Sequence, residues 1–233
     1  MYKKLSVLIP VFNEKKTIKK CVDNILNADT FGMELEIIIS DNNSNDGTVE
    51  ELKLINHNQI KIFFKDKNTG KGANLKNALA HATGDLILFQ DADLEYSPDD
   101  YPSMLKPFFE LNADVVYGSR FIRSKFTRIV GFPNYIANKI FTLFANILYN
   151  MIFTDIATGY KVFRSEVIKS LQIQSNGFEI EPEITAKISK IKKINIYEVP
   201  ISINSRDYDD GKKVRWWHFF IYIYTLLKWR FKK

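Results

Sequence analysis

Acidic side chains stand at every second position after an apolar run that ends at Gln90. They are Asp91, Asp93 and Glu95. Residues two apart on an extended backbone point to the same side, so we expect these carboxylates to converge. Carboxylates so close repel one another without a cation, and their hard oxygens suit Mg²⁺ or Mn²⁺ completed by substrate phosphates. The pattern predicts a divalent metal site, with a solvated acidic turn before the helix at Pro98 as the alternative.

Two further polar segments follow apolar runs. In the first, Asp41 ends a buried strand, where its carboxylate can accept hydrogen bonds from a nucleobase or ribose. Asx-turn and helix-cap chemistry is the alternative, and we favour it for residues 45–48. In the second, the glycine-rich loop 67–72 offers backbone amides and Lys71 to a phosphate. This loop lacks the Gly-x4-Gly-Lys-Ser/Thr spacing of a Walker motif, and an ordinary connecting loop is the alternative.

The elements that must position these residues alternate along the first half of the chain. The expected strands are Leu5–Phe12, Leu35–Asp41, Gln59–Lys65, Asp85–Asp91 and Ala113–Gly118. The expected helices between them are Glu14–Ala28, Thr48–Ile55, Gly72–Ala82 and Pro98–Leu111. Several strands are too continuously apolar to be half-exposed, which is typical of strands covered on both faces. The alternation predicts an α/β fold with a mostly parallel, doubly wound sheet, whose ligands bind at the carboxyl ends of the strands.

The second half begins with a segment that is apolar around most of a helix. Its expected elements are a helix over Asn134–Phe153, a strand over Tyr160–Arg164, a helix over Glu183–Ile191, a strand over Asn195–Ile203 and a helix over Val214–Phe231. No shift in composition marks a linker. We expect a catalytic domain over residues 1–213. Residues 214–233 would form an amphipathic helix that belongs to the same domain or docks on a membrane.

The charge is concentrated at one end of the chain. The 233 residues include 33 Lys and Arg against 27 Asp and Glu, a net charge of +6. The last thirty residues, from Asn204 on, hold eight basic and three acidic side chains and account for +5. A near-neutral body with a basic tail argues against a nucleic-acid-coating protein and for an end that meets an anionic surface or substrate. The single Cys21 excludes an intrachain disulfide and a cysteine metal cluster, and with no secretory signal visible it favours the cytosol.

The basic end is also rich in aromatic residues. Its uncharged stretch, Trp216–Leu227, has twelve residues, well short of the roughly 20 that a spanning helix needs. We therefore expect this helix to lie in the membrane interface, with its aromatics at headgroup depth and its cations toward anionic lipid. This predicts a peripheral protein at the inner face of the cell membrane. The alternative is a helix that packs on its own domain or on a partner subunit of a homo-oligomer.

Short motifs at the expected strand ends together resemble a known family. They are Pro10-Val11-Phe12-Asn13-Glu14, Ser40-Asp41, Asp46-Gly47-Thr48, Asn68-x-Gly-Lys-Gly72, Gly84-Asp85, Asp91-Ala-Asp93 and Gly118-Ser119-Arg120-Phe121. Later matches are Thr154-Asp155, the run from Thr158 to Arg164, Glu181-Pro182-Glu183, Glu198-Val199-Pro200 and Arg206 with Gly211-Lys212-Lys213. In this order, over nearly the whole chain, they resemble glycosyltransferase family 2, in its dolichol- and polyprenyl-phosphate mannose synthase-like branch. The resemblance implies the GT-A fold of nucleotide-sugar transferases.

The resemblance also implies which residues bind the donor. The nucleoside would be held by Pro10, Phe12, Glu14, Ile39 and Asp41. The diphosphate would be met by Asp91, Ala92 and Asp93, with Lys71 of the glycine-rich loop as a further contact to the nucleotide-sugar. Asn42 follows Asp41 where the family usually has a second acid.

The metal and the reacting groups follow from the same resemblance. Asp93 and Glu95 would ligate the metal. Mannose synthases commonly have Gln where this chain has Glu95, and the added negative charge can change which metal and which donor are bound. Arg120 would lie near the sugar or the acceptor phosphate, and Arg206 and Lys212 would close over the donor. The Gln-x-x-Arg-Trp motif of processive synthases is absent, which implies the transfer of one sugar per encounter.

The resemblance implies an inverting, metal-dependent transfer of one sugar from a nucleotide-sugar to a polyprenyl phosphate. The oxygen of a lipid phosphate is already ionised, so it needs no general base, and Arg120 or Arg128 would position it. A soluble family 2 enzyme with a hydroxyl acceptor is the alternative, and it would need a base near Asp155, Glu181 or Glu183. A nucleotidyltransferase would have a glycine-rich loop right after the first strand, which this chain lacks, and a non-catalytic binder would not need the intact acidic residues.

Overall fold

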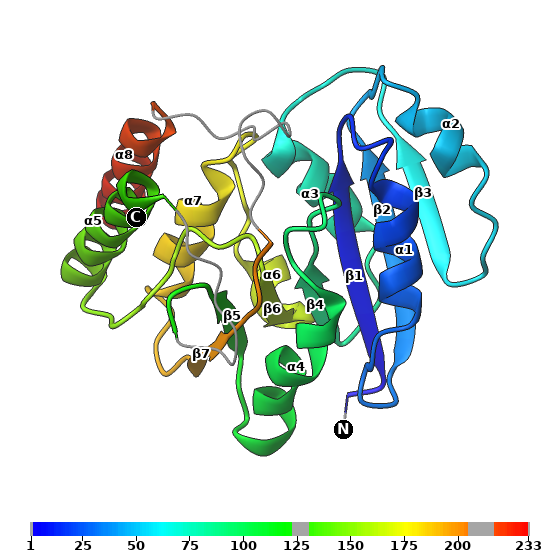
Figure 1. The fold of residues 1–233 in the computed structure, drawn as a ribbon. Coiled ribbons are helices and arrows are strands. Elements are labelled where there is room, and N and C mark those ends of the chain that lie inside the picture. Colours follow the sequence, from blue (N-terminus) through cyan, green and yellow to red (C-terminus); the bar gives the residue numbers. More distant parts are fainter. Residues whose placement is uncertain (1, 123–130, 205–216, 233) are drawn as a thin grey trace.

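The fold is built around one central sheet, seen in a computed structural model that describes residues 2–122, 131–204 and 217–232 (Figure 1). Seven strands of these described residues pair in the order β3-β2-β1-β4-β6-β5-β7. Their bounds are β1 Lys4–Val11, β2 Glu34–Asp41, β3 Ile60–Phe64, β4 Leu86–Phe89, β5 Val115–Ser119, β6 Lys161–Arg164 and β7 Ile196–Pro200. β6 runs antiparallel to β4 and β5, and the other pairs are parallel. The expected α/β fold with a mostly parallel sheet is confirmed.

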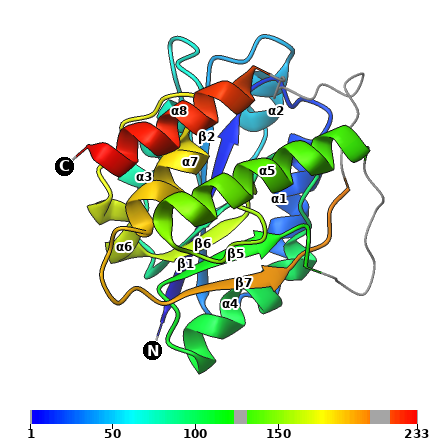
Figure 2. The same ribbon diagram turned by 90° about the vertical axis from the view of Figure 1, so that its left-hand side faces the viewer.

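Helices cover both faces of this sheet. Their bounds are α1 Ile18–Leu26, α2 Thr48–Lys53, α3 Lys71–Ala80, the 3₁₀ helix η1 Pro98–Asp100, α4 Tyr101–Glu110, α5 Phe132–Tyr149, α6 Ser165–Ser170, α7 Ile180–Ile188 and α8 His218–Phe231. Side chains of α1 and α4 join the core on one face, and those of α3, α5, α7 and α8 join the core on the other. On this second face α5 and α8 lie side by side and α8 also contacts α7 (Figure 2).

Strand β1 illustrates why the sheet must be covered on both sides. Val7 and Ile9 point into the core beneath α1 and α4, whereas Leu8 between them points into the opposite core. All three side chains are fully buried. A strand whose alternate residues are apolar on both faces can only be stable between two layers of helices.

The segment after β4 differs from expectation. The strand ends at Phe89, and residues 92–93 form a turn in which the following Leu94 has φ 63°. The predicted extended backbone under Asp91, Asp93 and Glu95 is therefore wrong. A residue with positive φ lies outside the β region of backbone conformation, so the alternation of an extended strand does not apply to these carboxylates.

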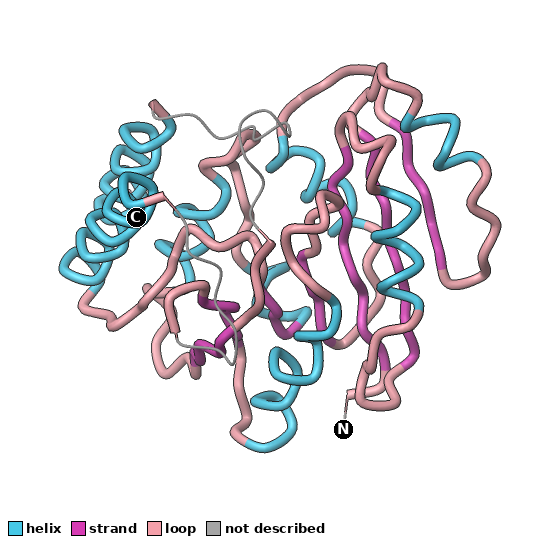
Figure 3. Tube along the Cα trace, viewed as in Figure 1, coloured by secondary structure: helices cyan, strands magenta, loops and turns pink. Residues whose placement is uncertain are grey.

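Two other differences affect the functional site. Helix α7 begins at Ile180 rather than at Glu183, which places Glu181 in its first turn. The antiparallel direction of β6 pairs its first residue, Lys161, with Phe89 at the end of β4. Lys161 therefore lies at the carboxyl edge of the parallel strands, where the connections are loops (Figure 3). The short helix α6 is not among the predicted elements, because six residues are too few to display a helical period.

Candidate active site

A cavity of about 1020 Å³ opens at the carboxyl ends of β1 and β4. One part of its lining, called here the polar wall, consists of Glu14, Asn42, Asn68, Lys71, Asn74, Asp91, Asp93, Glu95, Arg120 and Glu181. Another part, the apolar wall, comes from α5 and α8 and includes Phe132, Ile136, Ile140, Phe141, Phe219, Phe220 and Tyr222. The cavity thus lies where an open α/β sheet is expected to bind its ligands.

Lys71 is the first residue of α3 and lies within the polar wall. Its ammonium contacts Asp91 Oδ1 at 2.8 Å and Oδ2 at 2.9 Å, and it lies 3.6 Å from Glu181 Oε1. The preceding Gly70 has φ 94°, and a Cβ there would collide with the carbonyl of Asn176, so the helix start depends on a glycine. Burial by itself would lower the pKa of Lys71, but the charges of Asp91 and Glu181 outweigh it and raise the pKa. Lys71 is therefore a cation held between two carboxylates.

Lys161 pairs with the same glutamate as Lys71 and is fully buried. Its ammonium donates to Glu181 Oε2 and to the carbonyl of Thr158. Burial lowers the pKa of Lys161, and the charge of Glu181 offsets only part of that effect. Glu181 therefore has one oxygen held by Lys161 and the other directed toward Lys71.

Arg120 is fixed by a two-bond contact with a fully buried carboxylate. Its Nε and Nη2 atoms donate to Asp155 Oδ2 and Oδ1 at 2.6 and 2.7 Å. Glu198 holds the backbone of the same segment, since it accepts from the Asp155 amide at 3.1 Å, and burial raises the pKa of Glu198 despite these bonds. Two parallel bonds restrict both the position and the plane of a guanidinium. Arg120 thus presents a fixed positive group to the cavity.

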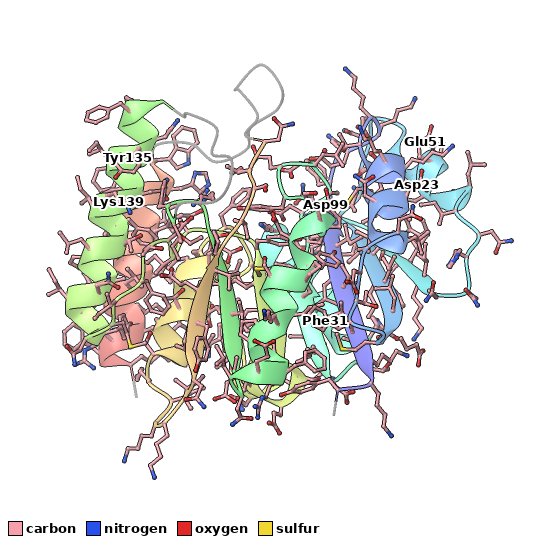
Figure 4. All side chains as sticks on the ribbon, turned by 60° about the horizontal axis from the view of Figure 1, so that its bottom comes forward. Asp23, Phe31, Glu51, Asp99, Tyr135 and Lys139 are labelled. Atoms are coloured by element: carbon pink, nitrogen blue, oxygen red, sulfur yellow. The ribbon has the colours of Figure 1, made fainter. Side chains whose placement is uncertain are left out.

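A second cation stands near Arg120 on α5. The Lys139 ammonium lies 4.6 Å from the ring centre of Phe121 and 5.6 Å from that of Tyr135. Tyr135 and Lys139, four residues apart, project from the same side of the helix (Figure 4). The start of α5 therefore adds aromatic rings and a positive charge to the region next to Arg120.

The acidic turn after β4 has its own internal contacts. Asp93 Oδ1 accepts a hydrogen bond from the Glu95 amide at 3.1 Å, and Asp91 is ion-paired with Lys71. The described residues contain no group of three or more His, Cys, Asp or Glu side chains arranged around a metal position. Mg²⁺, however, is commonly held by one or two carboxylates together with substrate phosphates. Asp93 and Glu95 both line the cavity, and carboxylates are the ligand type that such a metal would use.

The residues expected to hold the nucleoside fall into two groups. Pro10, Phe12 and Glu14 line the cavity. Ile39 is fully buried in the core, and the carboxylate of Asp41 accepts from the Ser44 amide at 3.0 Å and from its hydroxyl at 2.5 Å. These two residues do not line the cavity.

Asn42, next to Asp41, lines the cavity instead. Its side chain donates to Asn68 Oδ1 at 2.8 Å and accepts from the Thr69 amide at 3.0 Å, which ties the end of β2 to the glycine-rich loop. The sequence pattern singled out this strand end, but only the packing decides which of two neighbouring polar side chains faces the cavity.

Arg206 and Lys212 lie outside the described residues. The described chain before them runs along the acidic turn, because Ile203 forms a β-bridge with Tyr96 and the Asn204 amide donates to the Glu95 carbonyl at 2.9 Å. The described residues before this gap therefore end, at Asn204, next to the candidate metal ligands.

Tyr96 is a cavity residue that the sequence reasoning missed. Its ring stacks on Tyr160 with centres 4.9 Å apart, and its hydroxyl accepts from the Gly159 amide at 3.2 Å. Burial raises the pKa of Tyr96 to about 12. Its place directly after Glu95 was the available signal. Asn74, buried within α3, gave none, because a helical asparagine has no distinctive spacing.

Comparison with known proteins identifies the family. Residues 6–172 match the model described as glycosyl transferase family 2. The chain belongs to this family. A dolichol-phosphate mannosyltransferase of Pyrococcus furiosus is 27% identical over 97% of this chain and 64% of its own length. A dodecaprenyl-phosphate galacturonate synthase of Rhizobium johnstonii is 24% identical over 89% of this chain and 61% of its own length. This family 2 chain thus spans less than two thirds of either relative.

Solved structures show the same fold at lower identity. Glucosyl-3-phosphoglycerate synthase of Mycobacterium tuberculosis, solved with Mn²⁺, uridine diphosphate and phosphoglyceric acid, matches with a TM-score of 0.74 at 20% identity over 99% of this chain and 80% of that chain. Mannosyl-3-phosphoglycerate synthase of Rubrobacter xylanophilus matches with a TM-score of 0.70 at 19% identity over 97% and 72%. The expectation of a family 2 glycosyltransferase with the GT-A fold is confirmed, and the names of the two sequence relatives agree with the polyprenyl-phosphate branch.

Proposed function

We propose that this chain is an inverting, metal-dependent glycosyltransferase that moves one sugar from a nucleotide-sugar to a polyprenyl phosphate at the cytosolic face of a membrane. One observation carries the proposal: the same cavity has both a polar wall and an apolar wall. A nucleotide-sugar and a phosphate need the first, and a prenyl chain needs the second. The names of both sequence relatives also combine a sugar with a prenyl phosphate.

The donor would lie along the polar wall. Pro10, Phe12 and Glu14 would contact the nucleoside, and Asp93 with Glu95 would hold Mg²⁺ or Mn²⁺ against the diphosphate. When bound, the metal would offset the negative charge that grows on the leaving diphosphate.

Two cations would act on the same leaving group. Arg206 and Lys212 are proposed to approach the diphosphate, because their segment starts beside Glu95 at Asn204. Positive side chains that face the leaving oxygens lower the barrier by stabilising charge only as it develops.

The acceptor would lie at Arg120. A phosphate oxygen is ionised at neutral pH, so a fixed guanidinium suffices to hold it against the anomeric carbon, on the side opposite the diphosphate. Attack from that side inverts the configuration. A hydroxyl acceptor would need a base, yet Asp155 is bonded to Arg120, and Glu183 accepts from two backbone amides and pairs with Lys187 at 2.6 Å. Glu181, the third candidate base, is bonded to Lys161 and lies 3.6 Å from the Lys71 ammonium. This engagement favours the phosphate.

Helices α5 and α8 would meet the membrane. Outside the cavity lining they expose an outer apolar face, defined here as Leu143 and Ile147 of α5 with Tyr224 and Phe231 of α8. Neither helix contains an acidic residue, and Lys139, Lys228 and Arg230 add positive charge. Exposed apolar and aromatic side chains beside cations suit an anionic lipid surface. Within the described part of the chain, no helix is both long and apolar enough to cross a bilayer.

A donor panel tests the proposal directly. The full chain is incubated with radiolabelled uridine- and guanosine-diphosphate sugars, Mg²⁺ or Mn²⁺, and undecaprenyl or dolichyl phosphate, and the label is measured in the organic phase. At least one donor should give a lipid product that disappears when EDTA is added. No organic-phase label with any donor would reject the lipid acceptor.

A small phosphorylated hydroxyl compound is the second candidate acceptor. One structural neighbour was solved with phosphoglyceric acid, and Arg120 offers a suitable contact for the phosphate of such a compound. The same panel, run with phosphoglyceric acid and read in the aqueous phase, distinguishes this possibility. Aqueous product without lipid product would establish it.

A further inference from the structure

One oxygen in the polar wall lacks the hydrogen bond that its burial demands. Glu181 is 4% exposed, and its Oε1 atom has no hydrogen-bond partner among the described residues. Buried polar atoms are nearly always hydrogen-bonded, so an exception at a ligand cavity needs an explanation. The other oxygen of the same carboxylate is bonded to Lys161, which fixes the orientation of the group.

The Lys71 ammonium also approaches this oxygen. The ammonium lies 3.6 Å from Glu181 Oε1 but 2.8 Å from Asp91 Oδ1, so the two contacts differ by about 0.8 Å. A lysine ammonium is a compact charge on a flexible stem and can exchange one carboxylate for the other by a small movement. Lys71 therefore has a present partner in Asp91 and an incompletely used one in Glu181.

We propose that Lys71 moves from Asp91 to Glu181 when a divalent cation and the donor diphosphate bind at the acidic turn. The inference rests on the proposed metal and donor. A cation near Asp93 repels the ammonium and competes with it for the oxygens of Asp91. Glu181 then accepts the displaced ammonium, so no buried charge is left unpaired. In this scheme Glu181 is a positioning residue that acts through Lys71.

Lys161 explains why Glu181 can do this. Because Lys161 is fully buried and bonded to Oε2, it holds the carboxylate in place while Oε1 stays directed toward Lys71. A freely rotating glutamate would bond to Lys71 permanently or turn away from it. The pair of Lys161 and Glu181 thus provides a fixed second position for the ammonium.

A simpler explanation is that Glu181 only adds negative charge near the metal. Charge-balanced variants separate the two explanations, because Lys161→Met with Glu181→Gln removes one positive and one negative charge together. Removing both members of a buried ion pair is also much less destabilising than removing one. Lys187→Met with Glu183→Gln is the matched control, since Glu183 is a buried, lysine-paired carboxylate of α7 like Glu181, whereas Lys71 pairs with Glu181.

Mn²⁺ binding provides a readout that does not depend on turnover. The full chain is titrated with Mn²⁺ in the presence of uridine or guanosine diphosphate, free Mn²⁺ is followed by electron paramagnetic resonance, and folding is checked by circular dichroism. The Lys161→Met/Glu181→Gln variant should bind Mn²⁺ about tenfold more weakly than wild type. The Lys187→Met/Glu183→Gln control should stay within about twofold.

Adding Lys71→Met to the wild type and to the Lys161→Met/Glu181→Gln variant completes the test. Without Lys71 there is no ammonium to relocate, so the pair substitution should then change Mn²⁺ affinity by no more than about twofold. Lys71→Met alone, which removes the competitor for Asp91, should tighten Mn²⁺ binding without nucleotide. Two outcomes overturn the inference. One is that Lys161→Met/Glu181→Gln weakens Mn²⁺ binding tenfold even when Lys71 is replaced by Met, and the other is that it has no effect when Lys71 is present. No Mn²⁺ binding by the wild type with either diphosphate overturns the proposed metal dependence as well.

Discussion

The two walls of the cavity are built in opposite ways. Polar-wall side chains such as Lys71 and Arg120 are largely buried and each pairs with a carboxylate, so their charges are held in place before any ligand arrives. The apolar wall belongs to helices whose outer residues remain exposed, Ile147 by 75% and Phe231 by 77%. Preorganised charges can bind and orient the reacting groups. Exposed apolar helices can instead hold a protein at a lipid surface. Damage to the first should remove transfer, and damage to the second should remove lipid contact.

The largest effect is expected from Asp93→Asn. This change keeps the size of the side chain but removes the charge that would bind the metal, so transfer should fall about 10³-fold, as when several kcal/mol of charge stabilisation are lost. The measurement is initial rate in the donor panel, with thermal unfolding as the check on folding. Asp99→Asn, on η1 outside the cavity lining, is the matched control and should keep its rate. Turnover near the wild-type value in Asp93→Asn would contradict the metal assignment.

Arg120→Lys should have the next largest effect. Lysine keeps the positive charge but cannot make the two parallel bonds to Asp155 that fix the guanidinium. We expect the KM for the acceptor to rise about 30-fold while the KM for the donor changes little, because a cation that Asp155 no longer fixes should lose about 2 kcal/mol of its contact with the acceptor phosphate. Equal changes in both KM values would mean that Arg120 serves the donor, and the division of the polar wall into donor and acceptor parts would fail.

The same contrast decides what could be predicted from the sequence. The strand ends beside the polar wall could be predicted, because apolar runs in the sequence stop at polar residues there, as before Asn42 and Asp91. The ion pairs did not follow, because Lys71 with Asp91 and Arg120 with Asp155 join segments 20 and 35 residues apart. Only the tertiary arrangement, including the antiparallel β6, brings such partners together.

The apolar wall was predictable in composition but not in placement. The sequence of residues 134–153 and of the chain end shows apolar helices with few charges. It does not show that α5 and α8 lie side by side, since pairing of two distant helices depends on the shapes of both and leaves no periodic signal. The roles of Arg206 and Lys212 stay predictions, because they lie outside the described residues.

Substitutions on the outer apolar face should weaken membrane binding more than transfer. Ile147→Gln with Phe231→Gln removes two exposed apolar side chains that do not line the cavity. Binding to phosphatidylglycerol liposomes in a sedimentation assay should fall about tenfold, since each side chain contributes about 1 kcal/mol or less at an interface. Leu54→Gln with Leu111→Gln is the control, because both leucines are exposed but lie outside α5 and α8. It should leave binding unchanged. Equal losses in both variants would mean that the outer face has no special contact with lipid.

The smallest effect on transfer is expected from Glu36, a buried carboxylate of β2 that does not line the cavity. Burial alone would raise its pKa, but the Lys61 ammonium at 2.8 Å and hydrogen bonds from Ser6 and Thr83 lower the pKa of Glu36 to about 2. A carboxylate whose folded pKa lies below its ordinary value near 4.5 stabilises the fold fully above that pH, and the stabilisation is lost as the pH falls toward 2.

The loss can be followed by urea unfolding between pH 6 and pH 3. For wild type, Glu36 should contribute about 3 kcal/mol at pH 6 and progressively less toward pH 3, whereas Glu36→Gln should lack this part of the pH dependence. At pH 7 the folded fraction of Glu36→Gln should transfer sugar at the wild-type rate, because its charge stabilises the sheet and faces no ligand. A reduced rate per folded molecule would show that a charge outside the polar wall also affects the transfer rate. The statement that the polar wall alone controls transfer would then be wrong.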